Sequence, residues 1–356
     1  MTSRTIWLFV RNVLLSAFLL GAIATSFTSE AKSETVRVGH FSWPGYGFYR
    51  ILDEKGLAPG IDIEFTIIED PVQLFSLLAT DQLDVVTSTI EFGPIAAAED
   101  MPIKLVAYTN ISYGTDKIVL HPDIQGAEGL IGETVAVLEG GLAQIYMAIW
   151  LEQNGVSFSD VRMANLIMND AAAAMISGQV AGGEFWDPWG TNVLDDLEGA
   201  QLAAQSRDPF WLKTALLADA IYFSNDFIDN RRGVAIDLVT GYYKAVDWWY
   251  ANPAEGNQII ADYLQFSLAD VELVLGKDDI PEDAGLYVYT FMNTARFCGV
   301  APGDPPFGQT NGQMYDHWRL TNEWWIKFGL MSEMVSPAKG LDCTILGDVY
   351  ERGIWK

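Results

Sequence analysis

The stretch Val36-Arg-Val-Gly-His-Phe-Ser-Trp-Pro-Gly-Tyr46 decides how the chain begins to fold. Its first half, Val36 to His40, carries alternating apolar residues and predicts a strand. Its second half contains Pro44-Gly45, which predicts a turn where that strand ends. Trp43 and Tyr46 flank the turn, and we expect it to hold their rings over a cleft at the carboxyl end of the strand. The alternative is an ordinary turn with surface aromatics.

The chain continues as an alternation of strand and helix patterns. After the opening strand, the apolar periodicity predicts the helix Tyr49–Lys55, the strand Ile61–Ile68, the helix Pro71–Thr80, the strand Val85–Thr87 and the helix Gly93–Ala98. The pattern then restarts, with strands Lys117–Leu120, Thr134–Leu138 and Gly182–Phe185 and helices Gln144–Asn154 and Ala171–Ser177. This alternation is typical of α/β units with parallel strands and crossover helices, and two such units predict two lobes with a cleft between them.

The C-terminal third is predicted to be almost entirely helical. From about Asp226, apolar and aromatic residues recur at helical spacing in Asp229–Ala251, Asn257–Leu264, Leu268–Leu275, Leu286–Phe297 and Gln313–Phe328. We expect most of these aromatic rings to pack in the core. The length of 356 residues also favours two lobes over one.

Residues 1–31 have the features of a secretory signal peptide. Arg4 and Arg11 precede an apolar run from Val13 to Ala24, and small residues ending at Ala24 or Ala31 offer a cleavage site. The run is shorter than the roughly 20 residues that a membrane helix needs, which favours a cleaved signal over an uncleaved anchor. We therefore expect a protein exported to the periplasm.

Charge and cysteine content narrow the function classes. The formal net charge of −26 repels phosphate backbones and no basic cluster offsets it, so we expect no nucleic-acid partner. Cys298 and Cys343 are the two cysteines. An oxidising compartment permits a disulfide between them, although they can also sit apart as small apolar residues.

Several segments, taken in order, resemble the periplasmic solute-binding proteins of the nitrate, sulfonate and taurine type. They are Val36-Arg-Val-Gly39, Trp43-Pro-Gly-Tyr46, Asp53-Glu-Lys-Gly-Leu57, Gln73-Leu-Phe-Ser-Leu-Leu-Ala-Thr-Asp-Gln-Leu-Asp-Val-Val86, Leu130-Ile-Gly-Glu-Thr-Val-Ala-Val137, Ala173-Ala-Met-Ile-Ser-Gly-Gln-Val180 and Trp186-Asp-Pro188. The resemblance covers residues 34 to 226. It departs from the family at Ala181, where an acidic residue is common.

The resemblance implies an α/β, two-lobed periplasmic-binding-protein fold, with hinge strands between the lobes and a helical C-terminal portion. One lobe would comprise residues 34–116 plus 222–356 and the other residues 117–221, with hinge strands near Tyr113–Leu120 and Ala220–Ser224. Such a protein closes on a small solute and delivers it to an inner-membrane ABC permease with its ATPase. We expect it to act as a monomer and without a cofactor.

Four loops carry the candidate ligand-binding residues, beginning with Trp43 and Tyr46. In the segment 184–189, three aromatics and two carboxylates occur in six residues, and we expect Glu184, Trp186 and Asp187 to reach the cleft. Two further loops open helices with hydroxyls, glycines and free backbone donors, and their candidates are Ser88, Thr89, Glu91, Glu139 and Gly140. Residues Tyr113 to Asp116 would add side chains from the cleft floor. The alternatives are a packed Trp with solvated acids and ordinary helix capping.

The chemistry of these candidates favours an amine-bearing or cationic solute. They include carboxylates and aromatic rings but no basic residue, whereas nitrate and sulfonates are usually bound by Arg, Lys or backbone donors. Aromatic faces attract ammonium and guanidinium groups, and planar aromatic amines, such as the pyrimidine precursors that some relatives bind, would stack equally well. Helix N-termini can hold an anion, so a zwitterion such as taurine, an alkanesulfonate or nitrate stays open.

A secreted enzyme on the same fold is the rival class. His40, His121 and His317 are scattered without metal-site spacing, and the sequence has neither a Gly-x-Ser-x-Gly elbow nor a phosphate-binding Gly-x-x-x-x-Gly-Lys motif. The clustered cysteines that mark a pyrimidine-synthesising enzyme of this fold are missing as well. We expect no catalytic residue and no metal site.

Overall fold

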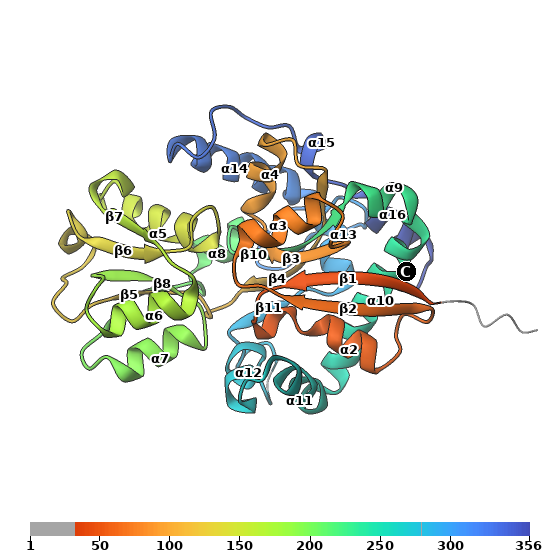
Figure 1. Cartoon of the computed structure of the whole chain (residues 1–356), viewed down its shortest axis with the longest axis horizontal. Coiled ribbons are helices and arrows are strands. Elements are labelled where there is room, and N and C mark those ends of the chain that lie inside the picture. Colours follow the sequence, from red (N-terminus) through yellow and green to blue (C-terminus); the bar gives the residue numbers. More distant parts are fainter. Residues whose placement is uncertain (1–32, 279) are drawn as a thin grey trace, which may run out of the picture. The chain divides into compact units, whose positions relative to one another are not determined.

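The computed structural model describes residues 33–278 and 280–356 (Figure 1). The predicted signal peptide lies outside these ranges. Two β-sheets organise the described chain, and their strand orders are β11-β4-β10-β3-β1-β2 and β7-β6-β8-β5-β9. Within the described ranges, no helix combines the length and apolar character that a membrane span requires.

The six-stranded sheet is mixed. Its strands are β1 (Glu34–His40), β2 (Ile61–Ile67), β3 (Val85–Thr89), β4 (Ile103–Ser112), β10 (Ala218–Ser224) and β11 (Leu286–Val288). β1 pairs in parallel with β2 and β3, as the alternating pattern predicts. β10 returns from the second sheet and pairs antiparallel with both β3 and β4, so it lies in the middle of the sheet.

The five-stranded sheet repeats this plan at smaller size. Its strands are β5 (Lys117–Leu120), β6 (Thr134–Val137), β7 (Arg162–Asn165), β8 (Gly182–Phe185) and β9 (Gln201–Gln205). β6 pairs in parallel with β7 and β8, whereas β5 pairs antiparallel with β8 and β9. We call the part built on this sheet the small lobe and the part built on the six-stranded sheet the large lobe. The chain passes between them at residues 113–116 and 206–217.

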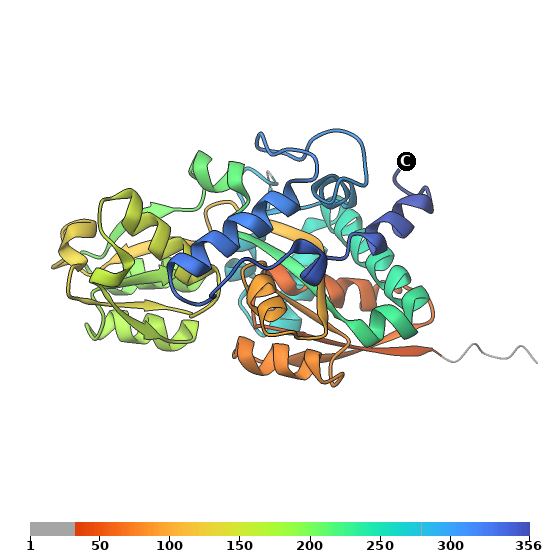
Figure 2. The same ribbon diagram turned by 90° about the horizontal axis from the view of Figure 1, so that it is seen from above.

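Helices cover both sheets, and many of their apolar faces are fully buried. Near the large lobe, α2 packs against α10 and α11, and α14 lies alongside α4 (Figure 2). The 3-10 helices are η1 (Pro44–Tyr46), η2 (Ala127–Leu130) and η3 (Phe158–Asp160). The α-helices are α2 (Phe48–Glu54), α3 (Pro71–Ala79), α4 (Phe92–Ala98), α5 (Leu142–Gln153), α6 (Met168–Ile176), α7 (Trp189–Asp196), α8 (Pro209–Thr214), α9 (Asn225–Asn230), α10 (Arg232–Ala251), α11 (Pro253–Leu264), α12 (Leu268–Leu275), α13 (Phe291–Phe297), α14 (Gln313–Lys327), α15 (Pro337–Gly340) and α16 (Thr344–Glu351).

The prediction of one helix over Leu286–Phe297 is wrong. Leu286–Val288 forms the edge strand β11 and pairs with β4, and α13 begins only at Phe291. A capping box stops the helix from extending backwards, because the Thr290 hydroxyl accepts from the Asn293 amide while the Asn293 side chain accepts from the Thr290 amide. The strand pairing and the cap together divide this segment.

The predicted second hinge strand lies within the six-stranded sheet. Ala220–Ser224 belongs to β10, which starts at Ala218 and is hydrogen-bonded on both sides within the six-stranded sheet. A lobe boundary between residues 221 and 222 would divide that strand. The return crossing therefore lies before Ala218, in residues 206–217.

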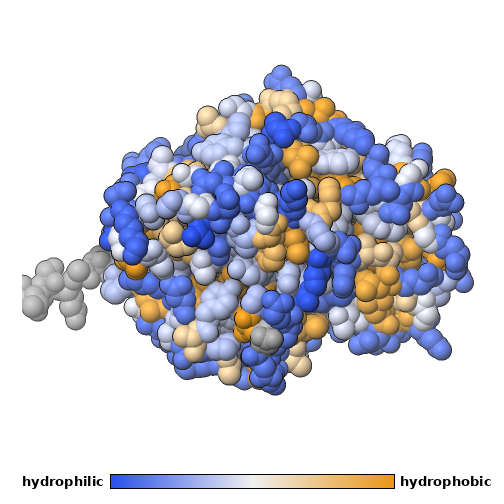
Figure 3. Space-filling view, turned by 180° about the vertical axis from the view of Figure 1, so that it is seen from behind, coloured by the Kyte–Doolittle hydropathy of each residue, from blue (hydrophilic) through white to orange (hydrophobic). Residues whose placement is uncertain are grey.

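Two further features concern the outer surface and the two cysteines. Hydrophilic residues cover much of the rear face, with hydrophobic residues between them (Figure 3). Cys298, which follows α13, and Cys343, which precedes α16, form a disulfide.

Candidate functional site

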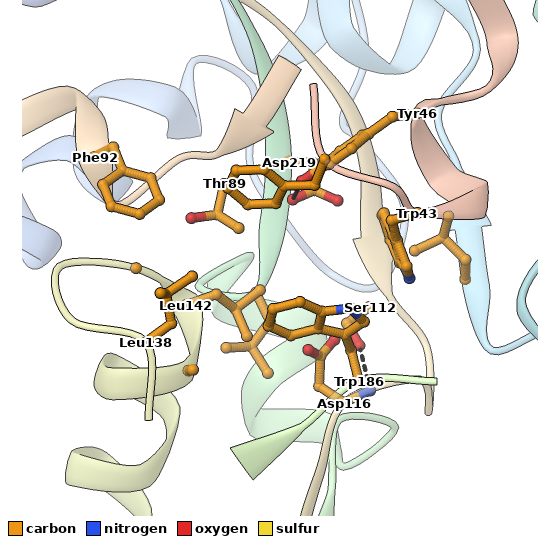
Figure 4. Close-up of a pocket in the computed structure, with 15 residues that line it drawn as sticks. Trp43, Tyr46, Thr89, Phe92, Ser112, Asp116, Leu138, Leu142, Trp186 and Asp219 are labelled. Atoms are coloured by element: carbon orange, nitrogen blue, oxygen red, sulfur yellow. Dashed lines mark hydrogen bonds between the residues drawn. The ribbon is translucent and has the colours of Figure 1, made fainter. Parts of the chain in front are cut away.

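A cavity between the two lobes gathers side chains from the ends of several strands (Figure 4). The empty space in this region is about 480 Å³, a volume that includes open solvent. The large lobe contributes Phe41, Trp43, Tyr46, Thr89, Phe92, Ser112, Asp219 and Leu286, the small lobe contributes Leu138, Gly141, Leu142, Ala143 and Trp186, and the two crossings contribute Asp116 and Leu217. Ligands in open α/β sheets bind beyond the carboxyl ends of strands, and this cavity has that position.

The opening turn of the chain supplies an aromatic wall. Pro44 starts η1, which places the Trp43 and Tyr46 rings edge to face with their centroids 5.0 Å apart. A Cβ atom on Gly45 would lie only 2.1 Å from the Trp43 ring, so the turn needs glycine at this position. Trp43 Nε1 donates a hydrogen bond of 3.1 Å to the backbone carbonyl oxygen of Asp187, which joins the large lobe to the small lobe.

Asp219 brings a carboxyl group into the cavity from the start of β10. Tyr46 donates its hydroxyl hydrogen to Asp219 Oδ1 at 3.0 Å. The pKa of Asp219 is raised to about 8, chiefly by burial and secondly by the nearby Asp116 charge, while hydrogen bonds from Tyr46 and Asn110 act in the opposite direction. Without a bound cation, the protonated form of Asp219 is therefore favoured near neutral pH.

Asp116 supplies a second carboxyl group from the first crossing. Figure 4 shows Asp116 and Trp186 on one side of the space and Asp219, Thr89 and Tyr46 on the other. Burial raises the pKa of Asp116, opposed by hydrogen bonds with Glu184 and Ser112 and by the charge of Lys117. Glu184 does not line the cavity, and burial together with the Asp116 charge raises its pKa well above the ordinary value.

Asp187 forms a buried ion pair instead of lining the cavity. Its carboxylate pairs with Lys117 and also accepts hydrogen bonds from the Thr191 amide at 3.0 Å and hydroxyl at 2.8 Å. Lys117 also donates to the carbonyl oxygens of Gly114 and Thr115 at 3.1 and 3.3 Å. The charge of Lys117 is therefore engaged by the loop that carries Trp186.

The structure brings some predicted site residues together and separates others. Trp43, Tyr46, Thr89 and Trp186 line the cavity. On β3, Ser88 points to the opposite face from Thr89, because side chains alternate along a strand. Glu91 is fully buried next to the cavity wall, and burial raises its pKa well above the ordinary value.

Three other candidates lie away from the cavity lining. Tyr113 packs beneath the Arg207 guanidinium, 4.1 Å from its ring centroid. Glu139 is exposed, and its amide donates to Asn165 Oδ1 at 3.0 Å. Gly140 has a positive φ of 77° and donates to Gln144 Oε1 at 2.8 Å, whereas its neighbour Gly141 lines the cavity.

Asp219 is the principal cavity residue that the sequence reasoning missed. A sequence signal for it exists, because it is the single charged residue in the apolar run Leu216-Leu-Ala-Asp-Ala-Ile-Tyr222. A carboxyl group in a buried strand requires a partner or a ligand. No comparable sequence signal marks the apolar lining residues, which are Phe41, Phe92, Leu138, Leu142, Leu217 and Leu286.

The histidines lie away from the cavity lining. Burial lowers the pKa of His40 to about 4, and its Nε2 is 2.7 Å from the Tyr263 hydroxyl. Burial also lowers the pKa of His317 to about 3, and its Nδ1 is 3.1 Å from the Tyr108 hydroxyl. Across residues 33–278 and 280–356, no group of three or more His, Cys, Asp or Glu side chains could hold a metal ion.

Comparison with known proteins identifies one family match and many similar structures. Residues 123–264 match the NMT1-like family. No curated protein matches the chain. The alkanesulfonate-binding protein SsuA from Xanthomonas axonopodis pv. citri, solved with bound MOPS, is 16% identical with a TM-score of 0.68, and the alignment covers 86% of this chain and 98% of that one.

Two other similar solved structures are a binding protein and an enzyme. The periplasmic nitrate-binding protein NrtA from Synechocystis PCC 6803 is 13% identical with a TM-score of 0.69, and the alignment covers 90% of this chain and 89% of that one. The desulfurization enzyme DSZB is 15% identical with a TM-score of 0.61, covering 90% and 99%. These matches confirm the predicted periplasmic-binding-protein fold and the predicted resemblance to binding proteins of the nitrate and sulfonate type.

Proposed function

We propose that this protein is the solute-binding component of an ABC importer and that it captures a small amine-bearing or cationic solute between its lobes. One observation carries the proposal. The cavity presents two carboxyl groups, from Asp116 and Asp219, and none of the described residues that line it is basic. Aromatic rings from Trp43, Tyr46 and Trp186 border the same space.

A cation is the ligand that offsets the cost of these buried acids. Burial raises the pKa of both Asp116 and Asp219, because a charged carboxylate is poorly solvated there. A cationic nitrogen between them would stabilise the ionised forms. Each contact with an aromatic face would add roughly 0.5 to 2 kcal/mol, depending on how far the cation is desolvated.

The fold supports a role in solute capture. The cavity lies between two lobes joined by two crossing segments, and closure of such lobes requires dihedral changes at only a few residues. Similar solved structures include binding proteins for alkanesulfonate and nitrate. The partners in this proposal are an inner-membrane permease and its ATPase, and the protein acts as a monomer in the periplasm after removal of a signal peptide.

A non-catalytic role fits the cavity better than an enzyme does. The described lining residues include no histidine, cysteine or lysine. The Ser112 hydroxyl is hydrogen-bonded to the Ser206 hydroxyl rather than to a general base. Since DSZB carries an enzymatic activity on this fold, the proposal rests on the cavity residues and not on the fold alone.

An anion is the second candidate ligand, and one observation favours it. Gly141, Leu142 and Ala143 line the cavity at the N-terminus of α5, where backbone amides point outward and the helix dipole attracts negative charge. Protonated Asp116 and Asp219 would also donate hydrogen bonds to a sulfonate or nitrate. This reading would make the raised pKa values part of anion recognition.

The two candidates predict opposite pH dependence. We would screen the protein by thermal shift against amines, guanidino compounds, taurine, alkanesulfonates and nitrate, at pH 6.5 and pH 9. A ligand at 100 times its dissociation constant should add about 2.7 kcal/mol to stability. Cation affinity should increase with pH as Asp219 ionises, whereas anion affinity should decrease. Shifts only with anions, and larger at pH 6.5, would refute the cation proposal.

A further inference from the structure

The two cavity carboxyl groups face the space from different parts of the chain. Asp219 lies on β10 of the large lobe, and Asp116 lies on the first crossing between the lobes. Each side chain is only about 4% exposed. Lys117, the cation nearest to Asp116 along the chain, is already paired with Asp187 and with two backbone carbonyls.

Each carboxyl group is held in place by protein donors but keeps spare acceptor capacity. The Tyr46 hydroxyl donates to Asp219, and side-chain hydrogen bonds with Asn110 and Ser112 stabilise ionised Asp219 and ionised Asp116, respectively. A carboxylate offers about four lone-pair sites, so one or two donors leave room for others. Buried acceptors that stay unsatisfied are costly, and a ligand that fills them gains correspondingly.

We propose that the solute carries a cationic nitrogen with at least two N–H groups and that Asp219 and Asp116 each accept one of them. This inference rests on the proposed function and specifies the ligand class of the same site. Primary amines, amidines and guanidines meet the requirement, whereas quaternary ammonium compounds do not. A cavity built from aromatic faces alone would accept both classes, because cation-to-ring attraction needs no N–H donor.

The rest of the cavity indicates how such a solute is oriented. Phe92, Leu138 and Leu142 lie together at one end, and Asp116, Trp186 and Trp43 lie toward the other end (Figure 4). The cationic nitrogen therefore lies beside the carboxyl groups, and the carbon skeleton extends toward Phe92. An arylalkyl amine is a suitable probe for this arrangement.

The test compares benzylamine with its N-methyl, N,N-dimethyl and N,N,N-trimethyl derivatives by isothermal titration calorimetry on the wild-type chain. All four carry one positive charge when protonated or quaternised, but the number of N–H donors falls to zero along the series. We expect affinity to fall by roughly tenfold or more from the first compound to the last, because each hydrogen bond to a charged group contributes substantially.

Two variants separate hydrogen bonding from ligand size. In Asp219→Asn and Asp116→Asn, the preference for benzylamine over the trimethyl derivative should shrink to within about threefold, since a charged hydrogen-bond acceptor is replaced by a neutral amide. Glu139→Gln also removes one carboxylate, but from an exposed residue outside the cavity lining, and it should keep the wild-type preference. Circular dichroism would confirm that all variants fold.

Each outcome decides the inference. Equal or tighter binding of the trimethyl derivative by the wild-type protein would overturn it and leave the cation proposal standing. A preference that persists unchanged in both Asp variants would also overturn it, because size alone would then explain the series. Binding of sulfonates or nitrate with no binding of any amine would overturn both this inference and the proposed function.

Discussion

The indole of Trp43 and the backbone carbonyl of Asp187 are joined by a 3.1 Å hydrogen bond that runs from the large lobe to the small lobe. Trp43 lines the cavity, and Asp187 belongs to the loop that carries Trp186. The same contact therefore closes the cavity and aligns aromatic residues contributed by both lobes. Since Asp187 is itself anchored by Lys117, the contact links the opening turn of the chain to a rigid part of the small lobe.

Replacing Trp43 with Phe should favour separation of the lobes. Trp43→Phe keeps an aromatic ring but removes the indole donor, and a hydrogen bond of this kind contributes about 0.5 to 1.5 kcal/mol net. We expect a larger radius of gyration in small-angle X-ray scattering and a roughly 2- to 10-fold weaker affinity for the solute. Trp248→Phe, on α10 outside the cavity lining, is the matched control. An unchanged radius and affinity would show that the contact does not hold the lobes together.

Breaking the Lys117–Asp187 pair should be strongly destabilising. The two side chains are 10% and 3% exposed, so Lys117→Met leaves an uncompensated charge on Asp187 in a buried site. We expect a loss of about 3 to 5 kcal/mol in the free energy of unfolding, measured by urea denaturation. The double variant Lys117→Met/Asp187→Asn should recover part of that loss, because no buried charge remains. If the double variant is less stable than the single one, the explanation from uncompensated charge is wrong.

The disulfide should stabilise the C-terminal part of the large lobe. Cys298 and Cys343 are separated by 45 residues, and closing a loop of this length restricts the unfolded chain. We expect the double variant Cys298→Ser/Cys343→Ser to lose about 2 to 4 kcal/mol of unfolding free energy. Adding a reductant should lower the denaturation midpoint of the wild-type protein and leave that of the variant unchanged. A reductant effect on both proteins would point to a cause other than this bond.

The predicted fold came mainly from local patterns, and the errors came from long-range pairing. Lys117–Leu120 and Gly182–Phe185 were predicted with the bounds that β5 and β8 have in the structure. The position of β10 could not be predicted in the same way, because its neighbours β3 and β4 lie more than 100 residues earlier in the chain. The edge strand β11 was hidden for the same reason, since it becomes a strand only by pairing with β4.

The cavity shows the same division between local and long-range information. Trp43, Tyr46, Thr89 and Trp186 could be assigned to the cleft because each follows or ends a strand that local periodicity predicts. Asp219 depends on the antiparallel insertion of β10, which places its carboxyl group opposite Thr89 in the strand register. Glu139 and Asp187 have the residue types expected of a ligand site, but an exposed loop position and an ion pair, respectively, remove them from the lining.

The raised pKa of Asp219 predicts a specific dependence of stability on pH. Its pKa in the folded protein is about 8, compared with an ordinary value of 3.8, so the folded state binds a proton that the unfolded state has already lost between these values. The stability associated with neutral Asp219 is therefore complete below about pH 4 and falls as the pH rises toward 8. Asp219→Asn keeps a neutral side chain at every pH. The unfolding free energy of the variant minus that of the wild type should therefore increase by on the order of 2 to 4 kcal/mol from pH 5 to pH 9.

Urea denaturation of both proteins across this range measures the difference directly. Asp116, Glu91 and Glu184 also titrate with raised pKa values and are present in both proteins, so the comparison measures the titration of Asp219 together with its interactions with these acids. A bound cation should reduce this pH-dependent difference in stability. It stabilises ionised Asp219 in the wild type, whereas the variant offers it no carboxylate at position 219. A stability difference that stays constant from pH 5 to pH 9 would mean that Asp219 is already ionised in the folded, ligand-free protein.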